Sequence, residues 1–127
     1  MQIWLKRAYE PPGPQDGTRV LVDRLWPRGV SKEEAQIDLW LKQIAPSDSL
    51  RKWFNHDPNK WELFKERYYQ ELKADKPEQV RDLADIAGQG RVTLVFGAKD
   101  ERLNNAAALK EYLEKNSKIP EKRGVRK

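Results

Sequence analysis

The sequence contains no cysteine, only one histidine and no long apolar run. The lack of cysteine excludes disulfides, thiol nucleophiles and cysteine-based zinc sites. With His56 as the single imidazole, a histidine-rich metal site is excluded as well. No apolar segment approaches the roughly 20 residues that span a bilayer, and the start, MQIWLKRAYE, is too short and too charged for a signal peptide. These absences predict a soluble, cytoplasmic protein.

The common catalytic motifs are also absent. The chain has no glycine-rich phosphate loop with its Lys-Ser/Thr pair, no dinucleotide fingerprint, no Gly-x-Ser-x-Gly elbow and no His-Glu-x-x-His. Nucleotide hydrolysis, hydride transfer and serine hydrolysis by the usual routes are therefore disfavoured. No cofactor is predicted, but acidic residues of the chain would allow a divalent metal ion to bind.

Charge is abundant but unevenly placed. The net charge is +5, and segment 117–127 has five basic residues and one acidic residue, so it holds most of the excess. Residues 1–116 are nearly neutral, and their length predicts a single domain. We expect the basic tail to be disordered. The alternative is that this basic tail binds a nucleic acid or protein partner.

Short apolar segments alternate with helical patterns along the domain. Strands are predicted over 3–7, 19–23 and 91–96, and segment 37–44 is ambiguous between strand and helix. Helix starts are predicted at Ser31, Ser47 or Asp48, Pro58 and Pro77, with a last helix over about 101–115. Unbroken apolar strands separated by helices predict an α/β fold: a small, mostly parallel, helix-flanked sheet of about three to four strands.

Charged side chains follow two of these strands. Asp23 and Arg24 end the second strand, and Lys99 and Asp100 follow the last one. Because carboxyl ends of parallel strands share one edge, we expect these side chains to gather there. Cations beside a helix N-terminus suit a phosphate or carboxylate. The predicted ligand-binding residues are Asp23, Arg24, Trp26, Arg28, Lys99, Asp100 and Asn104.

Three residues are candidates for proton transfer. Asp23 and Asp100 are suited to acid–base work or to a divalent ion. His56 is a candidate base, although its place just before a helix start favours a turn role. The predicted function is thus a small domain that binds an anionic ligand at the sheet edge, with catalysis left open.

Two other interpretations fit the same residues. Asp23, Arg24 and Arg28 would form a structural lock if the arginines were buried and fully paired, with Trp26 in the core. Alternatively, the protein is an accessory module that binds nucleic acid or a protein through its basic tail. The oligomeric state is not determined by the sequence.

Three stretches, RVLVDRLWPRGVSKEEAQIDLWLKQIAPSDSLRKWF, FKERYYQEL and VTLVFGAKDERLNNAAALKEYL, resemble the YeaO-like family of small bacterial proteins. The resemblance covers about residues 6–113 and implies a small α/β domain but no reaction, since the family has no assigned one. A histidine often follows the last motif asparagine in that family, whereas this chain has Asn105. The positions that match the family motif are Asp23, Arg24, Trp26, Pro27, Arg28, Gly29, Pro46, Ser47, Leu50, Arg51, Lys99 and Asn104.

Overall fold

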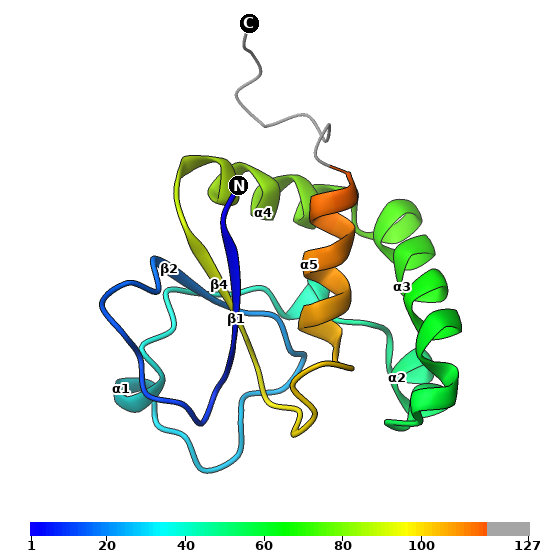
Figure 1. The fold of residues 1–127 in the computed structure, drawn as a ribbon, viewed down its shortest axis with the longest axis horizontal. Helices are drawn as coiled ribbons and strands as arrows, with labels where there is room; N and C mark the ends of the chain where they lie inside the picture. Colours follow the sequence, from blue (N-terminus) through cyan, green and yellow to red (C-terminus); the bar gives the residue numbers. More distant parts are fainter. Residues whose placement is uncertain (117–127) are drawn as a thin grey trace, which may run out of the picture.

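A computed structural model describes residues 1–116, and the predicted disorder of 117–127 lies outside the described residues. Four parallel strands form one sheet in the order β1-β4-β2-β3. They are β1 (Ile3–Arg7), β4 (Val92–Phe96), β2 (Thr18–Leu21) and β3 (Leu39–Trp40). With its helices, this arrangement confirms the predicted α/β fold with a small parallel sheet (Figure 1).

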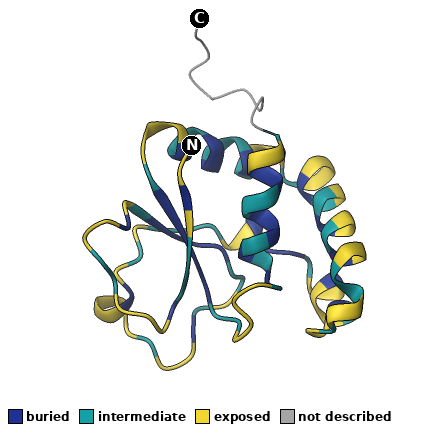
Figure 2. Ribbon diagram, in the orientation of Figure 1, coloured by how far each residue is buried: buried dark blue, intermediate teal, exposed yellow. Residues whose placement is uncertain are grey.

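The main core lies between one face of the sheet and the helices. Strand β4 is central and wholly buried, and its Leu94 aligns with Leu5 of β1 and Val20 of β2. The helices on this face are α2 (Asp48–Phe54), α3 (Trp61–Asp75), α4 (Pro77–Gln89) and α5 (Asn105–Lys115). Figure 2 shows their dark, buried sides turned toward the sheet. The predicted stripe on α3 packs here, and the buried Tyr68 hydroxyl donates to the Ile44 carbonyl at 2.6 Å.

The opposite face of the sheet has a thinner cover. The short helix α1 (Lys32–Ala35) begins with the predicted capping box of Ser31 and Glu34. Trp26 and Trp40 meet edge to face with ring centroids 5.5 Å apart, over the buried Leu21 of β2. Loops and two indoles, rather than long helices, therefore exclude water on this side.

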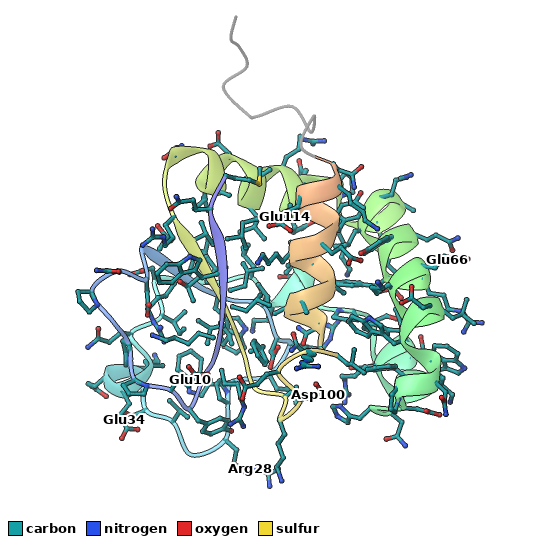
Figure 3. The ribbon with its side chains drawn as sticks, viewed as in Figure 1. Glu10, Arg28, Glu34, Glu66, Asp100 and Glu114 are labelled. Atoms are coloured by element: carbon teal, nitrogen blue, oxygen red, sulfur yellow. The ribbon has the colours of Figure 1, made fainter. Side chains whose placement is uncertain are left out.

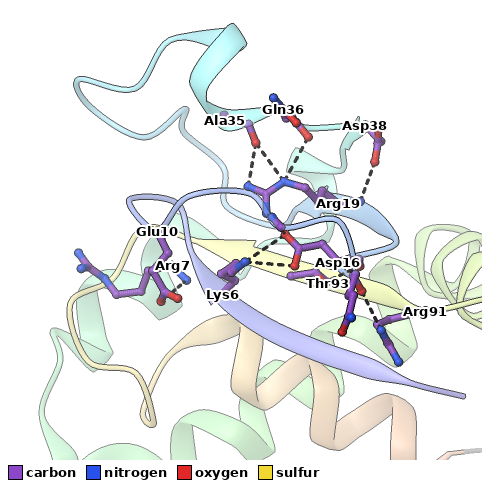
Figure 4. A network of polar contacts seen from close by, with 12 residues as sticks. Lys6, Arg7, Glu10, Asp16, Arg19, Ala35, Gln36, Asp38, Arg91 and Thr93 are labelled. Atoms are coloured by element: carbon purple, nitrogen blue, oxygen red, sulfur yellow. Dashed lines mark hydrogen bonds and ion pairs between the residues drawn. The ribbon is translucent and has the colours of Figure 1, made fainter.

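A buried charged network fixes the loop between β1 and β2 on this second face. The Asp16 carboxylate accepts from Arg19 Nη1 at 2.6 Å, from Lys6 Nζ at 3.1 Å and from the Gly13 amide at 3.0 Å (Figure 4). Its own carbonyl accepts from Thr93 Oγ1 at 2.7 Å. The chain thus contains a charged structural lock, but at Asp16 and Arg19 rather than at the positions proposed from sequence.

Several predicted boundaries were wrong by a few residues. Strand β2 ends at Leu21, so Asp23 lies beyond the ladder. Helix α5 begins at Asn105 and not near 101, because the Asp100 carboxylate accepts from the amides of Arg102 and Leu103 and makes a separate turn. The ambiguous segment 37–44 divides into β3 and a 3-10 turn, η1 (Lys42–Ile44). A second 3-10 turn, η2 (Pro58–Lys60), leads into α3.

Candidate functional site

A cleft of about 490 Å³ opens at the carboxyl edge of the sheet. It lies where the loops after β2 and β4 meet α2 and the start of α5. A volume of this size suits a drug-sized ligand. The cleft is lined by Asp23, Arg24, Leu25, Ala45, Pro46, Asp48, Arg51, Lys52, Phe54, Asn55, His56, Phe64, Ala98, Leu103, Asn104 and Asn105.

Asp23 is one of the two acids that line the cleft. Its Oδ2 accepts from the Gly97 amide at 2.9 Å, and its Oδ1 accepts from Asn105 Nδ2 at 3.0 Å. A side chain at Gly97 would place a Cβ 3.2 Å from Asp23 Oδ2, so glycine permits this close approach. Burial raises the pKa of Asp23, and the bonds from Asn105 and Gly97 only partly oppose that rise. Within residues 1–116 it forms no ion pair, so burial of this carboxylate is not offset by a cation.

Two arginines converge at the same cleft. Arg24 Nε lies 3.6 Å from Asp48 Oδ1, and Arg51 Nη2 lies 3.3 Å from that same oxygen. The distance from Arg24 Nε exceeds hydrogen-bond length, and this buried nitrogen has no hydrogen-bond partner among the described residues. Lys52, next in sequence to Arg51, also lines the cleft. One wall is therefore rich in cationic donors.

The local fold of α2 places these cations. Ser47 caps the helix by accepting from the Leu50 amide at 3.2 Å. Glu71 of α3 fixes the cap, because its carboxylate accepts from the Ser47 amide at 2.9 Å and from the Ser47 hydroxyl at 2.5 Å. Asp48 and Arg51 then lie one helical turn apart and form an i,i+3 pair.

The floor of the cleft is aromatic. Phe54 and Phe64 stack with ring centroids 4.4 Å apart, and the exposed His56 ring lies 6.3 Å from Phe54. Asn55 and His56 both have left-handed backbones, with φ of 46° and 56°. Asn55 is the left-handed C-cap that ends α2, and its amide donates to the Arg51 carbonyl.

Of the predicted residues, Asp23, Arg24, Asn104 and the candidate base His56 line the cleft, and the others do not. Asn104 is buried and acts as a cap, accepting from the Ala107 amide at 2.8 Å. Asp100 is exposed and lies outside the cleft lining; its turn bonds lower its pKa. Lys99 is exposed and lies outside the lining too.

The expected convergence of Arg24, Arg28 and Lys99 was wrong. Trp26 packs against Trp40, and its Nε1 donates to the Val30 carbonyl at 2.6 Å. These contacts turn the loop across the opposite face of the sheet, so Arg28 projects away into solvent (Figure 3). The alternative of a structural lock at Asp23, Arg24 and Arg28 does not hold either, because Arg28 is exposed and Asp23 has no charged partner in the described chain.

Sequence reasoning did not place Asp48, Arg51, Lys52 and Asn105 in the site. The match to the family motif is the one signal in the sequence for Arg51. Across residues 1–116, no three acidic, histidine or cysteine side chains are grouped as metal ligands. In the same range, no helix is long and apolar enough to cross a membrane.

Comparison with known proteins gives a family for this chain. A family profile described as the inactive DUF488-N3 subclade matches residues 2–124. The uncharacterised protein YeaO of Escherichia coli is 43% identical over 113 residues, which cover 89% of this chain and 97% of YeaO. The uncharacterised protein Rv3073c of Mycobacterium tuberculosis is 36% identical over 112 residues, covering 88% of this chain and 93% of that protein. No solved structure matches. The chain therefore belongs to the YeaO-like proteins of the inactive DUF488-N3 subclade.

Proposed function

We propose that this protein binds a small anionic molecule in the cleft at the carboxyl edge of its sheet. One observation carries the proposal: Arg24 and Arg51 converge on a single oxygen of Asp48, at 3.6 and 3.3 Å. Two guanidinium groups that share one oxygen are close enough to share one incoming phosphate or carboxylate. Charge-assisted bonds of this kind are shorter and stronger than neutral ones.

Asp48 is a replaceable partner for these arginines. Its side chain is 60% exposed, and those of Arg24 and Arg51 are 39% and 55% exposed. Exposed pairs contribute only about 0–1 kcal/mol to stability. A ligand anion can therefore displace the Asp48 carboxylate at little cost and also satisfy the unpartnered Arg24 Nε.

Binding without chemical conversion is the version of this function we favour. The family profile that matches the chain is described as inactive. The sole histidine is exposed, and Asp23 is held in place by bonds from Gly97 and Asn105. Neither residue donates to or accepts from the other in the described structure, so no acid–base pair is assembled.

The test is a two-dimensional NMR titration of the full chain with inorganic phosphate and with ribose 5-phosphate. We expect shifts at the amides of Gly97, Arg51 and Asn105, and loss of binding in Arg51→Ala. Arg28→Ala is the matched control, since it removes the same charge from an exposed arginine outside the cleft (Figure 3). Equal weakening by the two variants, or shifts confined to other surfaces, would refute a cleft-specific anion site.

A further inference from the structure

The cleft is lined by two groups of side chains with opposite hydrogen-bonding capacity. An amide nitrogen has two N–H groups, and Asn105 Nδ2 uses both, on Asp23 Oδ1 at 3.0 Å and on the Val22 carbonyl at 3.2 Å. Asn105 therefore retains only its carbonyl oxygen for a ligand. The ionised Asp23 carboxylate also only accepts. Asp23 and Asn105 therefore require hydrogen-bond donors from a ligand that contacts them.

A second group of lining residues requires acceptors. Arginine and lysine side chains have donors and no acceptor, and Arg24, Arg51 and Lys52 line the cleft beside the replaceable Asp48. The lining also includes the stacked rings of Phe54 and Phe64. A complementary ligand thus combines an anionic group with N–H donors on an apolar body.

We propose that the ligand is a mononucleotide with a guanine-type base, its phosphate at Arg24 and Arg51 and its N–H edge at Asp23. The inference rests on the anion site proposed above and names its substrate class. Guanine offers a ring N–H and an amino group side by side, which match the two oxygens of one carboxylate as a bidentate pair. Adenine presents a ring acceptor next to its amino group, so this acceptor nitrogen would face an acceptor oxygen of Asp23.

The state of Asp23 fits this assignment. The carboxylate is half-buried, no cation of the described chain pairs with it, and each oxygen accepts one bond with capacity for more. Burial raises its pKa, which means that the ionised form lacks compensation in the free protein. Two ligand N–H donors would supply that compensation and favour the ionised form.

The experiment compares three probes on the full chain by NMR titration: guanosine 5′-monophosphate, adenosine 5′-monophosphate and ribose 5-phosphate. On the wild type we expect the guanine nucleotide to bind about tenfold tighter than the other two, since one good charged hydrogen-bond pair is worth about that factor. In Asp23→Asn, whose side chain keeps the shape but loses one acceptor, the advantage should vanish while ribose 5-phosphate still binds. Arg51→Ala should weaken all three probes.

The outcomes separate this inference from the function it rests on. If all three probes bind equally and depend on Arg51, the anion site stands and the base assignment is overturned. If no probe binds, both fall. The comparison between the two nucleotides needs only the wild type, so it holds even if Asp23→Asn fails to fold.

Discussion

Replacement of Arg19 by methionine tests whether the Asp16–Arg19 pair holds the second face of the sheet. Arg19 donates to Asp16 at 2.6 Å, to the Ala35 carbonyl at 2.7 and 3.0 Å, and to the Gln36 carbonyl at 3.2 Å. Its side chain is only 4% exposed and that of Asp16 only 3%. Methionine keeps most of the aliphatic stem but provides none of these donors. The substitution therefore leaves a buried carboxylate and the Ala35 carbonyl short of partners.

Breaking a buried pair by removing one partner costs about 3–5 kcal/mol. Lys6 Nζ, at 3.1 Å, and the Gly13 amide still donate to Asp16 in the variant. We therefore expect a loss of folding free energy at the lower end of this range, about 3 kcal/mol. A domain of this size is stable by roughly 5–15 kcal/mol, so the variant remains folded but marginal. At about 4 °C per kcal/mol, the melting temperature should fall by about 12 °C.

Urea unfolding followed by tryptophan fluorescence measures this loss. Arg28→Met is the matched control, because the same change at an exposed arginine should alter stability by no more than about 0.5 kcal/mol. A loss below about 1 kcal/mol for Arg19→Met would refute the structural role assigned to the pair.

The same variant makes a prediction for acid. Burial alone would raise the pKa of Asp16, but bonds from Gly13, Lys6 and Arg19 outweigh burial and lower it. A carboxyl whose pKa is lowered by folding contributes stability that is complete above its ordinary pKa and is lost as pH falls through the lowered value. In Arg19→Met the pKa of Asp16 is lowered less, so less stability remains to be lost in acid. The stability difference between wild type and variant should therefore narrow as pH falls, in unfolding curves collected between neutral and acidic pH.

Three further predictions follow from the site and the backbone. Asp48→Asn should strengthen phosphate binding severalfold, because it removes the competing carboxylate; an unchanged titration would contradict the proposed displacement. Gly17→Ala should lower the free energy of unfolding clearly more than Gly29→Ala. Both glycines have left-handed φ, 69° and 79°, a conformation that destabilises alanine by about 1–2 kcal/mol. Only at Gly17 would the added Cβ also lie 2.2 Å from the Arg91 carbonyl oxygen. Equal losses in urea would refute the clash. Burial raises the pKa of Asp23, so ionisation of this carboxyl lowers the stability of the folded protein. The wild type should therefore lose stability relative to Asp23→Asn as pH rises through the raised pKa. Parallel stability–pH curves for the two proteins would contradict this prediction.

Local rules explain the elements that were predicted well. The run VTLVF gave a central buried strand because β-branched and aromatic residues suit a pleated surface buried on both sides. The capping box of Ser31 and Glu34 and the proline at position 58 also depend only on near neighbours in sequence. Helix α5 was misplaced at its start because two cap-forming residues, Asp100 and Asn104, compete there, and the sequence shows both.

The site was predictable only in part. Asp23 and Arg24 follow directly from the rule that parallel strands end at one edge, and both line the cleft. Arg28 is four residues further on, and its direction depends on where Trp26 packs, which is a contact with a distant strand. Arg51 reaches the cleft because Glu71, from another helix, fixes the Ser47 cap.

The sequence by itself therefore determined the fold class, most of the order of strands and helices along the chain, and the sheet edge where Asp23 and Arg24 lie. These features depend on periodicity, caps and strand direction, which act over a few residues. Only the tertiary structure decided which cations share a wall with Asp23, and that the buried ion pair lies at Asp16 and Arg19 instead. Those choices depend on packing between segments far apart in sequence, where a single partly buried indole or cap bond redirects a whole loop.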